Sequence, residues 1–210
     1  TMLLLLPDEM GGQARARATP CNDEVLSLQS DPDAMVDPRY RTVVGKLGWM
    51  ALVSRPDLAF SHSMFSRFNS CGGAKHMELV LGSVRYAYKT RHYKLVYGLG
   101  HSNKLFRTLA DGGCKLTLLE RFIVTMTDAS HGGARPQAGY LSLIAGGPVD
   151  WWSGRLPFTT LSSCESEWGG ATKAVVCTIA LRDTHSFMSG EAQPGPTPVL
   201  CDNKAAVQLS

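Results

Sequence analysis

The spacing of apolar residues changes once along this 210-residue chain, close to Gly98. From residue 37 to about 97, apolar side chains recur every three or four residues, which is typical of helices. From about residue 116 they come in short runs separated by glycine turns, which is typical of strands. The change predicts an α+β fold, in which a small helical bundle precedes a mixed sheet with helices.

The same pattern divides the chain into segments. Residues 1–36 show no sustained period and are predicted to form an irregular arm or linker. We expect a helical region at 37–97, a glycine-containing linker at 98–115 and an α/β domain at 116–210.

Individual elements can be placed more closely. Three helices are expected in the helical region, beginning near Asp37, after Pro56 and near Ala74. Strands are expected at residues 116–119, 122–127, 139–144, 148–152 and 199–201. Ser162 or Ser163 is predicted to cap a long helix that runs to about residue 188, and another helix is expected from Asn203.

Bulk composition bears on partners and compartment. The 21 Lys and Arg residues stand against 18 Asp and Glu residues, a balance that permits a nucleic-acid partner without requiring one. The six cysteines form no Cys-x-x-Cys pair, so we expect free thiols in a reducing compartment, cytoplasmic or nuclear. No stretch approaches the ~20 apolar residues of a membrane span, so no membrane partner is expected.

Three carboxylates occupy positions that suit a metal centre. Asp128 ends the predicted strand at 122–127, and Asp202 ends the predicted strand at 199–201. Glu167 lies near the start of the long helix. Carboxylate oxygens are the ligands that Mg²⁺ prefers, and two such ions can clamp the attacking and leaving oxygens of a phosphodiester. We therefore predict that Asp128, Glu167 and Asp202 are both metal ligands and catalytic residues.

Each acid also has a purely structural interpretation. Asp128 can start a turn, and Asp202 with Asn203 can cap a helix. Glu165 and Glu167 both lie where the helix dipole favours carboxylates. We assign that structural role to Glu165.

Several ordered motifs resemble the region that follows the polymerase palm in Ty1/copia-type retrotransposon polyproteins. The first group lies in the predicted helical region: YRTVVGKL at 40–47, SRPDLAF at 54–60, SRF at 66–68 and VRY at 84–86. The second group lies in the predicted α/β domain: GY at 139–140, GGPVDW at 146–151, LSSCESEW at 161–168, LR at 181–182 and LCDN at 200–203.

This resemblance implies a thumb or connection region followed by a ribonuclease H (RNase H) domain, which in the family degrades the RNA of an RNA–DNA hybrid. The family's metal-binding Glu is the second of a Glu-x-Glu pair, which maps to Glu167. The implied cofactor is Mg²⁺, and the implied partner is an RNA–DNA hybrid or other nucleic acid.

The chain departs from the family in several respects. It lacks the palm, so it is not a polymerase by itself. Ser130 stands where the family commonly has a second Asp, and Ala180 stands where a Trp is usual. The chain ends at Ser210, before the last strand, the last helix and the fourth metal-site residue that the resemblance implies. We therefore expect an incomplete, C-terminally truncated RNase H-like domain.

Two functions follow as alternatives. The first is a retrotransposon-derived, metal-dependent RNase H-type endonuclease. The second is a catalytically inactive, element-derived structural or interaction protein. An incomplete sheet would leave an open edge at the strand carrying Asp202, which we expect a protein partner or self-association to cover.

Two further groups have open interpretations. Lys89, Arg91 and Lys94 surround Tyr88 and Tyr93, and basic groups interleaved with aromatic rings suit a nucleic-acid backbone. The alternative is a solvated helix end. His131, close to Asp128 in sequence, can contact a substrate phosphate or be a loop residue without a role.

Overall fold

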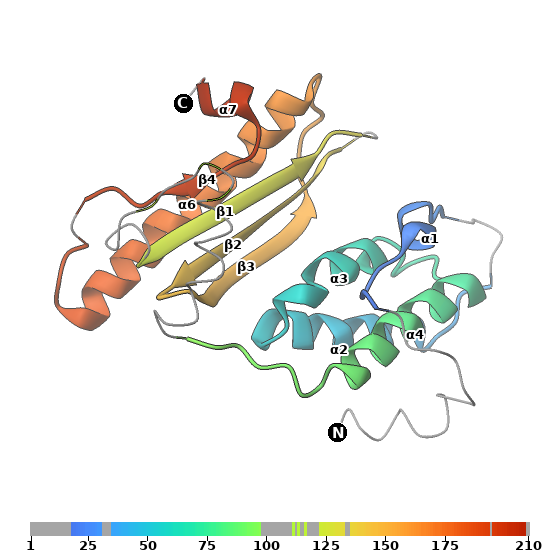
Figure 1. Cartoon of the computed structure of the whole chain (residues 1–210). Coiled ribbons are helices and arrows are strands. Elements are labelled where there is room, and N and C mark those ends of the chain that lie inside the picture. The colour runs from blue at the N-terminus through green and yellow to red at the C-terminus, as the bar shows by residue number, and fades with distance from the viewer. Residues whose placement is uncertain are drawn as a thin grey trace. The chain divides into compact units, whose positions relative to one another are not determined.

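The computed structural model describes residues 18–30, 35–97, 111, 113, 116, 122–132, 135–193 and 195–208. The chain forms two compact units, Thr1–Lys94 and Leu95–Ser210 (Figure 1). The first is helical and the second contains a four-stranded mixed sheet with helices, so the predicted α+β class is confirmed. No described helix is long and apolar enough to cross a membrane.

Within its described residues, the helical unit contains three main helices and two short ones. Its elements are α1 (Asp23–Leu26), α2 (Tyr40–Val53), the 3-10 turn η2 (Pro56–Leu58), α3 (Ala59–Ser66) and α4 (Ala74–Lys89). Pro56 opens the 3-10 turn because a proline at this position needs no backbone N–H donor. The helix predicted after Pro56 is therefore a 3-10 turn followed by a two-turn α3.

Tyr40 is the centre of the helical core. Its side chain is fully buried and its hydroxyl donates to the Phe65 carbonyl at 2.9 Å, which ties α2 to α3. Burial raises the pKa of Tyr40 well above the ordinary value for tyrosine, so this donor stays protonated. The ring also lies against Gly72, where any side chain would clash with it.

The stretch predicted to be an irregular arm contributes to this core. Residues 18–30 contain the one-turn helix α1, and Val25 within it is fully buried. The Ser83 hydroxyl of α4 donates to the Pro20 carbonyl, which fixes the segment to the bundle. A four-residue helix is too short to produce a repeating apolar pattern, so it was not predicted from the sequence.

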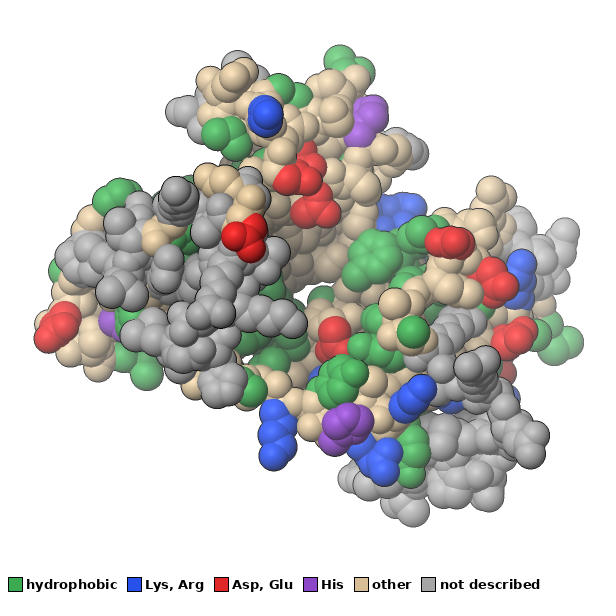
Figure 2. Space-filling model, in the orientation of Figure 1, with side chains coloured by type: hydrophobic (Ala, Val, Ile, Leu, Met, Phe, Trp, Pro, Cys, Tyr) green, Lys and Arg blue, Asp and Glu red, His purple; other side chains and the backbone are tan. Residues whose placement is uncertain are grey.

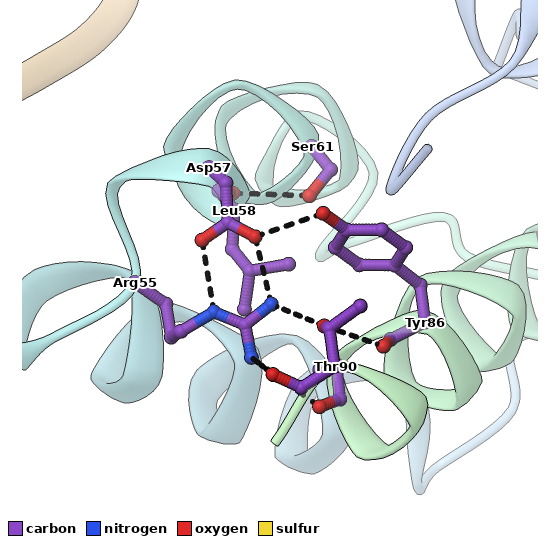
Figure 3. A network of polar contacts seen from close by, with 7 residues as sticks. Arg55, Asp57, Leu58, Ser61, Tyr86 and Thr90 are labelled. Atoms are coloured by element: carbon purple, nitrogen blue, oxygen red, sulfur yellow. Dashed lines mark hydrogen bonds and ion pairs between the residues drawn. The ribbon is translucent and has the colours of Figure 1, made fainter. Parts of the chain in front are cut away.

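Arg55 connects the turn after α2 to the end of α4 (Figure 3). Its guanidinium pairs with both carboxylate oxygens of Asp57, at 2.9 and 2.7 Å. It also donates to the Thr90 hydroxyl at 2.6 Å and to the Ala87 carbonyl at 3.3 Å. The carbonyls at the end of α4, which have no partner within the helix, are thereby satisfied by a charged donor.

Asp57 completes the network by accepting a hydrogen bond from the Tyr86 hydroxyl at 3.1 Å. Burial opposes ionisation of Asp57, but the hydrogen bonds and charge of Arg55 outweigh it and lower the pKa. Because the folded-state pKa is depressed, this stabilisation is present above the ordinary pKa of Asp, about 4. It is lost as the pH falls through the folded-state value.

The second unit contains a sheet with strand order β3-β2-β1-β4. Its elements are β1 (Ile123–Ser130), β2 (Gln137–Ile144), β3 (Gly147–Arg155), α6 (Ser163–Ser189), β4 (Val199–Leu200) and α7 (Lys204–Gln208). The pairs β1–β2 and β2–β3 are antiparallel, whereas β1–β4 is parallel. The predicted linker at 98–115 and strand at 116–119 lie outside the described residues, apart from positions 111, 113 and 116.

The long helix α6 packs on one face of the sheet. Gly170 lies so close to β1 that an added Cβ would be 3.3 Å from Thr127 Oγ1 and 3.4 Å from Ala129 Cβ. A buried hydroxyl chain reinforces this contact, with Thr125 Oγ1 2.7 Å from Thr178 Oγ1 and 3.0 Å from Ser142 Oγ. The start of α6 is therefore fixed against the part of β1 that carries Asp128.

The Arg55 network yields a stability prediction. In Arg55→Gln, Asp57 and the carbonyls at the end of α4 lose their charged donor, so the free energy of unfolding should fall by about 2 kcal/mol at neutral pH. Denaturant unfolding of the full chain measures the change. Arg39→Gln is the matched control, since the Arg39 side chain in its ion pair with Asp37 is 62% exposed and should contribute little. Equal stability of Arg55→Gln and wild type would contradict the prediction.

Candidate metal centre

The parallel pairing of β1 and β4 places two of the three predicted acids at one end of the sheet. Met126 pairs with Leu200, and Asp128 and Asp202 each follow two residues later. Neighbouring strands of a sheet lie about 4.8 Å apart. The strand predicted to end before Asp128 continues to Ser130, so Asp128 lies within β1 and pairs with Gly139. Asp202 follows β4 at the same level, and both acids are exposed.

At the start of α6, Glu165 and Glu167 have different roles, and Glu165 belongs to the helix cap. The Ser162 hydroxyl accepts from the Glu165 backbone N–H at 3.1 Å, and Glu165 Oε2 accepts from the Leu161 N–H at 2.7 Å. This reciprocal arrangement is a variant of the capping box, because Glu165 accepts from the residue before the N-cap rather than from the N-cap itself, and it occupies the Glu165 carboxylate at the helix start. The structural role predicted for Glu165 is confirmed.

Glu167, two residues further on, lies on the inner side of the helix. It is only 5% exposed, and its carboxylate accepts from the Cys201 thiol, with Oε2 3.6 Å from Sγ. The potential ligand atoms of Glu167, Cys201 and Asp202 all lie within 4.8 Å of one another. The structure thus brings Glu167 and Asp202 together and adds a thiol that the sequence analysis did not single out.

Glu167 is held in an environment that disfavours its negative charge. Burial raises its pKa, and the charges of Asp128 and Asp202 raise it further. Hydrogen bonds from the Ala129 backbone N–H and the Cys201 thiol oppose the shift without cancelling it. A bound cation would remove this accumulation of negative charge.

Asp128 is placed differently from the other two acids. Its neighbours Thr127 and Ala129 lie against α6. Because side chains alternate along a strand, the Asp128 side chain lies on the other face of the sheet. Its carboxylate is not among the atoms that lie within 4.8 Å of one another. Its charge nevertheless acts on Glu167, which places it in the same electrostatic site.

Two of the three clustered donors are of the kind that a hard divalent cation takes. The carboxylates of Glu167 and Asp202 offer oxygen atoms, which suit Mg²⁺ or Mn²⁺. The Cys201 sulfur does not suit Mg²⁺, and burial raises the pKa of its thiol, which keeps it protonated as a donor to Glu167. Cys201 directly precedes Asp202, but a lone cysteine without a spacing pattern gave no signal in the sequence.

Two neighbouring residues hold the site in shape. Asn203 Oδ1 accepts from the Ala206 N–H at 3.0 Å, so Asn203 rather than Asp202 caps α7. His131 Nδ1 lies 3.3 Å from the hydroxyls of both Thr160 and Ser166. This contact ties the segment after β1 to the start of α6. Both interpretations of His131, a contact to a substrate phosphate and a loop residue without a functional role, stay predictions.

Comparison with known proteins gives relatives from retrotransposons. The chain is 30% identical over 161 residues to a transposon Ty5-1 protein of Saccharomyces cerevisiae, covering 74% of this chain and 46% of that protein. It is 26% identical over 171 residues to the retrovirus-related Pol polyprotein from transposon TNT 1-94 of Nicotiana tabacum, covering 81% of this chain and 12% of the polyprotein. These similarities relate the chain to retrotransposon proteins, and the chain spans less than half of either relative.

A further relative is the secreted RxLR effector protein 161 of Plasmopara viticola, 28% identical over 139 residues. That match covers 64% of this chain and 85% of the effector protein. No protein-family model and no solved structure matches the chain.

The environment of Glu167 yields a prediction about stability without metal. Because the folded-state pKa of Glu167 is raised, folding becomes less favourable as the pH rises from about 4.3, the ordinary pKa of Glu, through the folded-state value. At neutral pH with a chelator present, Glu167→Gln should therefore unfold at a higher temperature than wild type. Its free energy of unfolding should be greater by roughly 1 kcal/mol.

Differential scanning calorimetry measures this shift, and Glu165→Gln on the same helix is the control. The control should show no gain, because Glu165 already accepts a backbone hydrogen bond in the cap. A Glu167→Gln variant that melts below wild type would show that the buried carboxylate is stabilising as it stands.

Proposed function

We propose that the second unit is an RNase H-type nuclease domain that hydrolyses the RNA strand of an RNA–DNA hybrid, with Mg²⁺ held by Asp128, Glu167 and Asp202. The first unit then corresponds to the thumb or connection region of a Ty1/copia-type polyprotein. The observation that carries the proposal is the approach of Glu167 to Asp202 within 4.8 Å, beside the charge of Asp128, at the end of a parallel strand pair. The relationship to retrotransposon proteins supports it.

The residues of the site have distinct tasks in this proposal. Asp128 and Asp202, both exposed, present oxygens to solvent where a phosphodiester can approach. The Ala129 N–H and the Cys201 thiol donate hydrogen bonds to the Glu167 carboxylate and orient it, and its remaining lone pairs are left for a cation. Divalent ions held by these carboxylates would, when bound, activate the attacking water and stabilise the leaving oxygen.

A second candidate is a catalytically inactive structural or interaction protein. The outer side of α6 supports it, because four apolar side chains there are 41–62% exposed: Trp168, Val175, Val176 and Ile179. The strand β4 also lies at the edge of the sheet within the described residues. Exposed apolar side chains and an edge strand are features that a protein partner or a second copy can cover.

The decisive experiment is hydrolysis of a labelled RNA–DNA hybrid by the full chain with Mg²⁺. Asp128→Asn and Asp202→Asn should each lower the rate of hydrolysis by at least ~100-fold. Substitution of residues that only support a metal's ligands already lowers activity by up to ~100-fold, and a direct ligand should matter at least as much. Glu165→Gln is the matched control and should retain activity, because Gln also accepts the Leu161 N–H bond of the capping box.

Equal hydrolysis by wild type and Asp202→Asn would assign the activity to another source and contradict the proposal. A folded wild-type chain without hydrolysis, combined with self-association in light scattering, would favour the second candidate instead.

A further inference from the structure

We propose that the exposed surface at the end of α4, formed by Lys89, Arg91, His92, Tyr93 and Lys94, binds single-stranded nucleic acid. We refer to these five residues as the α4-end surface. It lies in the helical unit and contains none of the acids of the candidate metal centre. The proposal therefore stands apart from the hydrolytic function.

All five side chains of the α4-end surface are exposed, and Tyr93 is 59% exposed. Lys and Arg side chains gather beside a histidine at this end of the helical unit (Figure 2). Within the described residues, the ion pairs are Arg39–Asp37 and Arg55–Asp57, so neither Lys89, Arg91 nor Lys94 is paired with a carboxylate there. The sequence contains no acidic residue between Glu78 and Asp111. The positive charge of the α4-end surface is thus available to phosphates.

Asp57 is the carboxylate bound at this end of α4, and it is already neutralised. Arg55 pairs with both of its oxygens, and the Tyr86 hydroxyl donates to it. The network that closes the end of α4 therefore does not draw on the basic residues beyond it.

Planar groups on this surface are held in fixed positions. The Arg91 guanidinium lies 4.4 Å from the centre of the Tyr88 ring and donates to the Tyr88 carbonyl at 2.9 Å. The Tyr93 backbone N–H donates to the Thr90 carbonyl at 2.9 Å, and the His92 and Tyr93 rings meet edge to face at 5.0 Å. Aromatic rings beside a basic track are the features on which unpaired bases stack. A duplex offers no base faces to such rings, so the geometry favours a single strand.

A purely structural explanation accounts for part of this arrangement. Basic residues near a helix C-terminus offset the helix dipole, and Arg91 contacts the last turn directly. That explanation does not require Lys94, five residues beyond Lys89, or an exposed ring at Tyr93. An acidic protein surface would use the positive charges but not the ring. Substitution of the ring therefore separates these alternatives.

The test is the affinity of the full chain for a labelled, single-stranded ~12-nucleotide oligonucleotide, measured by fluorescence anisotropy with a chelator present. Tyr93→Leu should weaken binding roughly tenfold, the range expected for one stacked base, whereas Tyr93→Phe keeps the ring and should bind like wild type. The double variant Lys89→Gln, Lys94→Gln should lower the slope of log affinity against log salt by about 1.4, or 0.7 per phosphate contact.

Two controls define the contrary results. Lys75→Gln changes an exposed lysine at the opposite end of α4 and should leave affinity unchanged. The assay contains a chelator and measures binding without hydrolysis, so failure of the nuclease proposal is distinguishable from failure here. The proposal is overturned if the chain does not bind the single strand or if Tyr93→Leu binds like wild type. It is equally overturned if Lys75→Gln loses as much affinity as the double variant, or if the RNA–DNA hybrid binds as tightly with the same response to Tyr93→Leu.

Discussion

The parallel pairing of β1 with β4 decides where the acidic residues of this chain meet. Only Thr125 and Met126 of β1 pair with β4, through Val199 and Leu200. This short ladder nevertheless places Asp128, which lies within β1, at the same level as Asp202, which follows β4. Because β4 follows the 27-residue helix α6, the pairing also requires α6 to cross the sheet and present Glu167 at the same end. Fold and site therefore depend on one contact between distant segments.

Close packing of α6 on β1 makes that arrangement specific. Gly170 lies at packing distance from Thr127 and Ala129, where an added Cβ would be 3.3 Å from Thr127 Oγ1, and these two residues flank Asp128. The glycine weakens the helix as a local element by roughly 1 kcal/mol relative to alanine. The close approach explains its position, because Glu167 is three residues away on the same helix. The missing side chain at Gly170 lets the start of α6 approach the part of β1 that carries Asp128.

Local signals in the sequence predicted most of the fold, while long-range contacts were less accessible. Ser162 was among the two predicted caps because capping depends on residues within one turn, and α6 begins there. Val25 was missed because a single helical turn has no period, although its burial depends on the whole bundle. Asp128, Glu167 and Asp202 were named from strand ends and a helix start. The approach of Glu167 to Asp202, the hydrogen bond that the Cys201 thiol donates to Glu167 and the exposed position of Asp128 depend on the register in which distant strands pair. No single segment encodes that register.

We propose that these carboxylates form a site for a divalent cation, and calorimetric titration of Mg²⁺ into the full chain, without nucleic acid, is the direct test. We expect saturable binding that Asp202→Asn weakens by at least ~10-fold, because the variant removes a carboxylate oxygen beside Glu167. Unchanged Mg²⁺ affinity in Asp202→Asn, or no saturable binding by the folded wild-type chain, would contradict the proposed site.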